Sequence, residues 1–213
     1  MDQPWVIFDM DGTLIDSMRY WRTIGQEYLE AHAIPGDHTE LLQRVENMSM
    51  LESAELFQQE FDLPDTPYEI AEEMEDMIAM HYLTDIELKP GAAEYLRRLR
   101  EDDVWLCVAT ATPTPLAHAC LERLGVADCF AFIVSCDDVG AGKTRPDIFL
   151  ECAWRFGAEP FEIAVFEDAH YAARTAKSLG FYVIGVYDAD SADRWDEMQQ
   201  ICDETITGWD ELL

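Results

Sequence analysis

The chain has 213 residues, enough for one sizeable core together with a smaller appended domain. Its 44 acidic residues outweigh 14 lysines and arginines, and the resulting formal charge of −30 repels nucleic acid, so we expect no DNA or RNA partner. No segment approaches the ~18 consecutive apolar residues of a membrane span, and the N-terminus lacks a secretory signal pattern. We therefore expect a cytoplasmic globular protein without a membrane partner.

The first predicted element is a short apolar strand at residues 5–8, which two carboxylates follow directly. Asp9 and Asp11 emerge at the end of this strand, and Gly12-Thr13 turns the chain immediately afterwards. Open α/β sheets place their ligand crevice at the carboxyl ends of strands. The pair therefore suits a carboxylate nucleophile beside a carboxylate acid/base, as an aspartyl-phosphate mechanism requires. A plain Asp-x-Asp-Gly turn is the alternative interpretation.

A helical block follows, with no convincing strand between residues 15 and 85. The helical stretches are separated by Pro35-Gly36 and Pro64-Asp65 and cover residues 17–33, 38–61 and 67–83. A helical block inserted directly after a strand is typical of a lid over the crevice of a sheet. We therefore expect an α-helical cap at residues 15–85 and a catalytic core built from residues 1–14 and 86–213.

The second half alternates apolar runs with helical patterns. Strands are expected at residues 104–109, 130–135, 163–166 and 182–186, and helices near 91–101, 115–125, 147–157 and 169–179. Strands separated by helices of 10–15 residues imply right-handed crossovers and a parallel sheet. The fold class is therefore α/β, with a doubly wound, Rossmann-like core. The six scattered cysteines include no C-x-x-C pair and are expected to be reduced rather than zinc-binding or disulfide-bonded.

Three further polar sites fall after apolar runs or at a glycine turn. Thr110 ends the second strand and could donate to a phosphoryl oxygen. Lys143 lies between a glycine turn and a helix start, where its ammonium can meet a bound phosphate. Glu167 and Asp168 end a later strand, and Asp168 with Asp9 could supply the hard oxygen ligands that magnesium prefers. Turn or cap residues and an ordinary surface lysine remain the plain alternatives.

The order of these motifs resembles the haloacid dehalogenase-like hydrolase superfamily over essentially the whole chain. The matching motifs are Asp9-x-Asp11-Gly12-Thr13, Thr110, Lys143 and Glu167-Asp168. A helical insert directly after the first motif resembles the subclass with an α-helical cap, which includes β-phosphoglucomutase and sugar-phosphate phosphatases. The resemblance implies a Mg²⁺-dependent enzyme acting on a small phosphorylated metabolite, and we expect it to be monomeric.

The same resemblance implies a role for each matching residue. Asp9 would attack phosphorus, and Asp11 would protonate the leaving oxygen and then activate water. Thr110 and Lys143 would hold the phosphoryl oxygens. The magnesium ligands would be the carboxylates of Asp9 and Asp168 and the backbone carbonyl of Asp11, with Glu167 in support.

Departures from the family pattern bear on the substrate. Ala111 follows Thr110 at a position expected to line the substrate, where asparagine or serine is frequent in the family. Related sugar-phosphate mutases carry a cap histidine about twelve residues after the nucleophile, and this position is Trp21 here. The difference favours a phosphatase, with a phosphomutase as the alternative and a non-enzymatic binding protein on the same fold as a more remote one.

Three arginines are the cations of the predicted cap, histidines aside. Arg19, Arg22 and Arg44 are candidates for contact with the substrate, and Arg44 lies close to the expected inter-helix region. Exposed ion pairs with the many neighbouring acids are the alternative interpretation.

Overall fold

The computed structural model describes residues 3–45 and 48–213. The chain divides into two compact units. The core unit comprises Met1–Ser17 and Ile86–Leu213, and the helical unit comprises Met18–Asp85.

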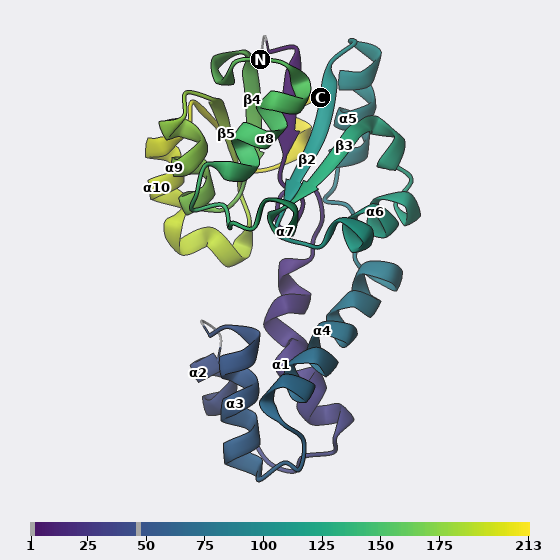
Figure 1. The fold of residues 1–213 in the computed structure, drawn as a ribbon, viewed down its shortest axis with the longest axis vertical. Coiled ribbons are helices and arrows are strands. Elements are labelled where there is room, and N and C mark those ends of the chain that lie inside the picture. Colours follow the sequence, from purple (N-terminus) through teal and green to yellow (C-terminus); the bar gives the residue numbers. More distant parts are fainter. Residues whose placement is uncertain (1–2, 46–47) are drawn as a thin grey trace. The chain divides into compact units, whose positions relative to one another are not determined.

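The core unit is built on one sheet of six parallel strands (Figure 1). Their order across the sheet is β3-β2-β1-β4-β5-β6. The strands are β1 (Trp5–Phe8), β2 (Trp105–Thr110), β3 (Phe130–Ser135), β4 (Ile163–Glu167), β5 (Tyr182–Val186) and β6 (Glu204–Ile206). The predicted doubly wound parallel sheet is confirmed, because the order reverses on either side of β1 and every neighbouring pair is parallel.

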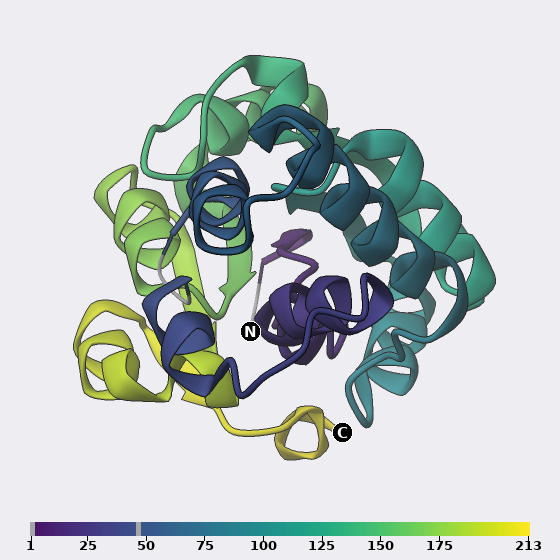
Figure 2. The same cartoon turned by 90° about the horizontal axis from the view of Figure 1, so that it is seen from below.

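Helices cover both faces of this sheet (Figures 1 and 2). They are α5 (Ala92–Glu101), α6 (Thr114–Arg123), α7 (Cys136–Val139), α8 (Asp147–Phe156), α9 (His170–Ser178) and α10 (Trp195–Ile201), and the 3-10 turns are η1 (Ala127–Cys129), η2 (Pro160–Glu162), η3 (Ala189–Arg194) and η4 (Trp209–Leu212). Successive strand side chains point to opposite faces. Ile7 therefore packs in the cluster that α8, α9 and α10 cover, whereas Phe8 stacks on Phe166 at 4.8 Å and meets Trp209 of η4 on the other face.

The central position of β1 decides where the first motif lies. Phe8 is in register with Val108 of β2 on one side and with Phe166 of β4 on the other. The residues that follow these three strands therefore meet at one edge of the sheet. This edge is where Asp9, Thr110 and Glu167 end or leave their strands.

The helical unit contains α1 (Met18–Ala31), α2 (Thr39–Val45), α3 (Met50–Phe61) and α4 (Pro67–Thr84). Capping boxes begin two of these helices: Ser49 with Glu52 for α3, and Thr66 with Glu69 for α4. Buried aromatic and aliphatic side chains, including Tyr28, form the interior of the unit.

Several elements differ from the sequence-based expectation. The helical stretch expected at residues 38–61 is two helices, because the Ser49 capping box starts a new one; Glu46 and Asn47 of the expected inter-helix region lie outside the described residues. The short strand β6 and helix α10 had no clear pattern, because three and seven residues carry little periodicity. Within the described part of the chain, no helix has both the length and the apolar character that a membrane crossing requires.

Candidate active site

Asp9 is buried directly after β1, where its backbone N–H donates to the Phe166 carbonyl at 2.9 Å. This bond continues the parallel ladder by one residue and fixes the carboxyl group at the strand end. Oδ1 of Asp9 accepts a hydrogen bond from Lys143. For Oδ2, no donor among the described residues lies within hydrogen-bonding distance. A buried carboxylate oxygen without a partner is costly unless a cation or a reacting atom completes its environment.

A tight turn begins at Asp11, where the backbone N–H groups of Leu14 and Ile15 both donate to the Met10 carbonyl. Gly12 adopts a φ of 76°, a left-handed conformation that favours glycine. The Asp11 carboxylate is held by three hydroxyl groups. Ser17 donates to Oδ1 at 2.7 Å, and Thr112 and Thr110 donate to Oδ2 at 2.7 and 3.3 Å. Hydrogen bonds therefore orient both oxygens of the Asp11 carboxylate.

Lys143 bridges two carboxylates in the interior. Its ammonium donates to Asp9 Oδ1 and, at 2.7 Å, to Glu167 Oε1. Burial by itself would lower the pKa of Lys143, but the charges and hydrogen bonds of Asp9 and Glu167 outweigh it, so that the pKa is raised. Lys143 is thus paired with two carboxylates that favour its charged form. It neutralises part of the negative charge at the strand ends.

Three buried acids gather at this edge: oxygen atoms of Asp9, Glu167 and Asp168 lie within 4.8 Å of one another. Burial, together with the charge of Asp9, raises the pKa of Glu167 to about 7, although Lys143 counteracts it. Burial and the neighbouring Asp9 and Glu167 charges also raise the pKa of Asp168. Like charges crowded in a low dielectric favour uptake of a proton or of a cation.

The donor set fits a magnesium ion. Carboxylate oxygens are hard ligands, and Mg²⁺ takes one or two of them together with water and phosphate oxygens. One carboxylate oxygen from each of the three acids lies close enough to the others for them to share a single ion. Asp168 is oriented by two hydroxyls, Thr13 at 3.2 Å to Oδ1 and Ser191 at 3.4 Å to Oδ2. Supporting hydrogen bonds of this kind orient metal ligands.

The core unit brings together most of the residues that the sequence singled out. The group comprises Asp9, Asp11, Thr110, Lys143, Glu167 and Asp168. Ala111 follows Thr110 and is exposed. Arg19, Arg22 and Arg44 belong to the helical unit, and their contact with the substrate stays a prediction. Arg19 lies over the ring of Tyr20 at 4.7 Å and donates to its hydroxyl.

Sequence reasoning did not assign the hydroxyl groups that hold the two aspartates. Ser17 and Thr112 orient Asp11, and Thr13 and Ser191 contact Asp168. Thr112 had a usable signal, because it follows Thr110 by two residues at the end of the same strand. Ser191 had none, because it reaches Asp168 from a turn 23 residues away.

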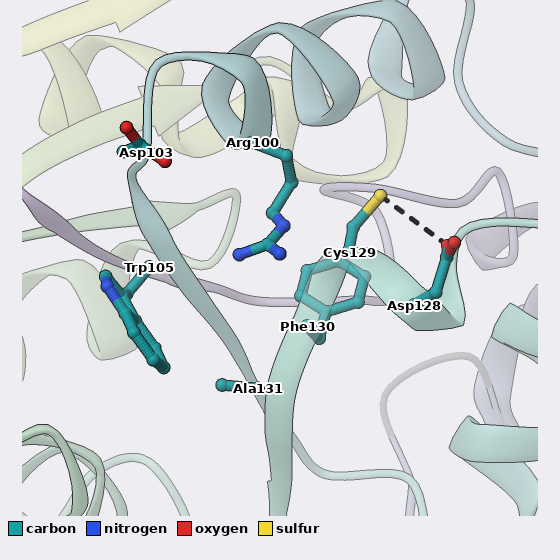
Figure 3. A pocket seen from close by; sticks show the side chains of 7 residues that line it. All are labelled: Arg100, Asp103, Trp105, Asp128, Cys129, Phe130 and Ala131. Atoms are coloured by element: carbon teal, nitrogen blue, oxygen red, sulfur yellow. Dashed lines mark hydrogen bonds between the residues drawn. The ribbon is translucent and has the colours of Figure 1, made fainter.

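A hollow of about 270 Å³ lies elsewhere, at the opposite edge of the sheet, where β2 and β3 begin (Figure 3). Its lining residues are Arg100, Asp103, Trp105, Asp128, Cys129, Phe130 and Ala131. Figure 3 shows Arg100 between Trp105 and Cys129, with Asp103 and Asp128 at the sides. Two acids flank one cation there, so the hollow offers no net positive charge for a phosphate. The acidic cluster at the carboxyl ends is the candidate active site.

Comparison with known proteins identifies the family of this chain. The family model described as haloacid dehalogenase-like hydrolase matches residues 4–180. The chain is 31% identical to the beta-phosphoglucomutase of Bacillus subtilis, over 85% of this chain and 82% of that protein. It is 32% identical to (DL)-glycerol-3-phosphatase 2 of Arabidopsis thaliana, over 95% of this chain and 85% of that protein. The crystal structure of CbbY from Rhodobacter sphaeroides in complex with phosphate has the same fold, with a TM-score of 0.75 at 23% identity, covering 99% of this chain and 96% of that one.

The model match spans most of the chain, and both curated relatives are aligned over most of their own length. The chain therefore belongs to the haloacid dehalogenase-like hydrolase family, as an enzyme of the phosphoric monoester hydrolase type.

Proposed function

We propose that this enzyme is a magnesium-dependent phosphatase that hydrolyses a small phosphorylated metabolite, such as a sugar or polyol phosphate, through an aspartyl-phosphate intermediate. The observation that carries the proposal is the buried Asp9 carboxylate, with one oxygen on Lys143 and the other without a partner among the described residues. A carboxylate nucleophile needs one oxygen that is free to form a bond.

Each step uses a residue at the strand ends. Asp9 attacks phosphorus and the ester P–O bond breaks, while Asp11 gives its proton to the leaving oxygen. Asp11 then takes a proton from water, whose oxygen attacks the phosphorus of the aspartyl-phosphate and releases inorganic phosphate and free Asp9. Lys143 and Thr110 contact the phosphoryl oxygens in this scheme. Positioning and charge neutralisation supply most of the rate enhancement in phosphoryl transfer.

Asp9, Asp168 and the Asp11 carbonyl would hold the magnesium ion, and Glu167 would support the cluster. When bound, the ion neutralises charge on the phosphoryl group and on the acids around it. Lys143 keeps Glu167 and Asp9 from repelling each other, and Thr13 keeps the Asp168 carboxylate oriented.

Hydrolysis is favoured over isomerisation by the residue at the mutase histidine position. Trp21 donates its indole N–H to the Tyr82 hydroxyl at 3.0 Å, linking α1 to α4. An indole cannot transfer protons as an imidazole does. Trp21, which is 38% exposed, therefore links two helices of the helical unit and does not act as an acid or base. A phosphomutase remains the second candidate because the Bacillus subtilis relative carries that name.

The helical unit would act as the cap that selects the substrate, and the enzyme would act as a monomer. A cap joined by two connections is suited to hinge closure, which excludes water and commits the substrate. The large negative charge disfavours nucleic acid as a partner.

The direct test is hydrolysis of a generic aryl phosphate by the purified chain, followed by a screen of phosphorylated metabolites. We expect activity with Mg²⁺, none in excess chelator, and a rate at least ~10³-fold lower in the correctly folded Asp9→Asn variant. Near-wild-type turnover by Asp9→Asn would exclude Asp9 as the nucleophile. Formation of an isomer from a hexose 1-phosphate, without release of phosphate, would favour the mutase.

A further inference from the structure

A second ion pair, which is largely buried, lies beside the acidic cluster and is formed by Lys89 and Asp188. The Lys89 ammonium is 2.7 Å from Asp188 Oδ2, and the two side chains are 14% and 5% exposed. The same ammonium donates to the Tyr187 carbonyl at 3.0 Å. The chain has only three lysines, and two of them, Lys89 and Lys143, form ion pairs with buried carboxylates in the core unit.

The pair is connected to both sides of the active site. The backbone N–H of Lys89 donates to the Leu14 carbonyl at 2.9 Å, in the loop that follows the first motif. On the other side, Asp188 accepts from the Asp190 N–H at 2.9 Å and so shapes the turn η3. Ser191 of that turn donates its hydroxyl to Asp168 Oδ2 at 3.4 Å. One short turn therefore joins Asp188 to Asp168.

The charge of Asp188 also acts on Asp168 electrostatically. Without Lys89, Asp188 would be a carboxylate without a paired cation, beside a cluster in which three carboxylates already share the single charge of Lys143. Extra negative charge favours a divalent cation and disfavours a phosphate dianion, and in a poorly hydrated site both effects are appreciable.

We propose that Lys89, paired with Asp188, is a positioning residue that balances the charge beside Asp168, so that the site binds both Mg²⁺ and a phosphate group. The inference rests on the proposed function. It goes further by assigning to Lys89 a role that the four sequence motifs do not contain.

Removing Lys89 and removing Asp188 should shift the affinities for Mg²⁺ and for phosphate in opposite directions. Lys89→Met leaves Asp188 uncompensated, so Mg²⁺ should bind about fivefold more tightly and inorganic phosphate about fivefold more weakly. Asp188→Asn leaves the ammonium uncompensated, so both affinities should shift by similar factors in the reverse direction. The double variant removes both charges and should return each affinity to within about twofold of wild type.

The experiment measures Mg²⁺ binding by calorimetry at pH 8 without substrate, and inorganic phosphate binding by competition against aryl phosphate hydrolysis. Lys177→Met is the matched control, because it removes a lysine from a more exposed ion pair with Asp203 at 2.5 Å. It should leave both affinities unchanged.

A parallel loss of both affinities in Lys89→Met, or no change in either, would overturn the proposal. The proposal would also be overturned if the affinities of the double variant were as far from wild type as those of the more affected single variant. A purely structural defect is not repaired by removing the partner residue. If Lys89→Met does not fold, Asp188→Asn alone decides by the direction of its shifts. Absence of Mg²⁺ binding by wild type would instead refute the metal site of the proposed function, and the phosphate measurements would then decide on Lys89.

Discussion

Lys143 Nζ lies 2.7 Å from Glu167 Oε1, and the same ammonium binds Asp9, so one cation holds two buried carboxylates together. Removing it leaves two buried carboxylates without their shared cation, and breaking a buried pair costs about 3–5 kcal/mol. For Lys143→Met we therefore expect kcat/KM to fall at least ~10²-fold. In metal-free protein, the Tm should fall by at least ~5 °C. Lys177→Met is the control, because it removes a lysine from a more exposed ion pair. An unchanged Tm in Lys143→Met would contradict the structural role of Lys143.

Asp168 is expected to control the magnesium requirement. Asp168→Ala removes one of the carboxylates of the cluster, so the Mg²⁺ concentration for half-maximal activity should rise at least ~10-fold, or turnover should be lost. Ca²⁺ should inhibit the wild type, because its larger and less regular coordination misplaces the nucleophile. Asp196→Ala, on the exposed surface of α10, is the control for loss of one acid. Full activity of the wild type or of Asp196→Ala in excess chelator would rule out a magnesium requirement.

Thr112 is expected to position the acid/base. Thr112→Val keeps the shape of the side chain but removes the 2.7 Å hydrogen bond to Asp11 Oδ2. We expect kcat to fall about 10-fold with little change in KM, because the bond orients the proton-transfer group. The comparison is Thr175→Val, whose hydroxyl donates to a helix carbonyl of α9. Equal effects of the two substitutions would show that Thr112 has no special role.

The stability of the helical unit is expected to depend on pH through His81. Its two ring nitrogens face Glu27 of α1 at 2.7 Å and Asp85 at 2.8 Å, and its ring lies 4.5 Å from that of Tyr20. Burial would lower the pKa of His81, but the hydrogen bonds and charges of Glu27 and Asp85 raise it overall.

A raised histidine pKa stabilises the folded state at low pH. The contribution is complete below the unfolded value of about 6.5 and is lost as the pH rises through the folded value. The Tm of wild type should therefore fall more between pH 6 and pH 8.5 than the Tm of His81→Gln. Parallel curves for the two proteins would contradict the assignment.

The cap arginines are expected to act on the substrate rather than on the chemistry. Alanine at whichever of Arg19, Arg22 and Arg44 contacts the substrate should lower kcat/KM for the preferred ester by ~10-fold or more. A small aryl phosphate offers a cap little to bind and should be affected much less. If each of the three variants changed kcat/KM equally for both substrates, substrate selection would have to come from other groups of the helical unit.

Local sequence was sufficient for the parts of the site that depend on neighbouring residues. The apolar run before Asp9, the glycine at position 12 and the acids after β4 identify strand ends, and parallel strands place their carboxyl ends at one edge. Periodicity likewise predicted five of the six strands. It missed β6, since three residues cannot show a period.

By itself, then, the sequence determined the fold class, the position of Asp9 and Asp11 at a strand end, and the order of the four motifs. The tertiary structure decided which side chains meet: that Lys143 joins Asp9 to Glu167, that Thr112 and Ser17 hold Asp11, and that Lys89 pairs with Asp188. Backbone periodicity arises from interactions between residues close in the chain, and these can be read in order. Partners such as Lys89 and Asp188, which are 99 positions apart, are set by where the loops converge after the sheet has formed.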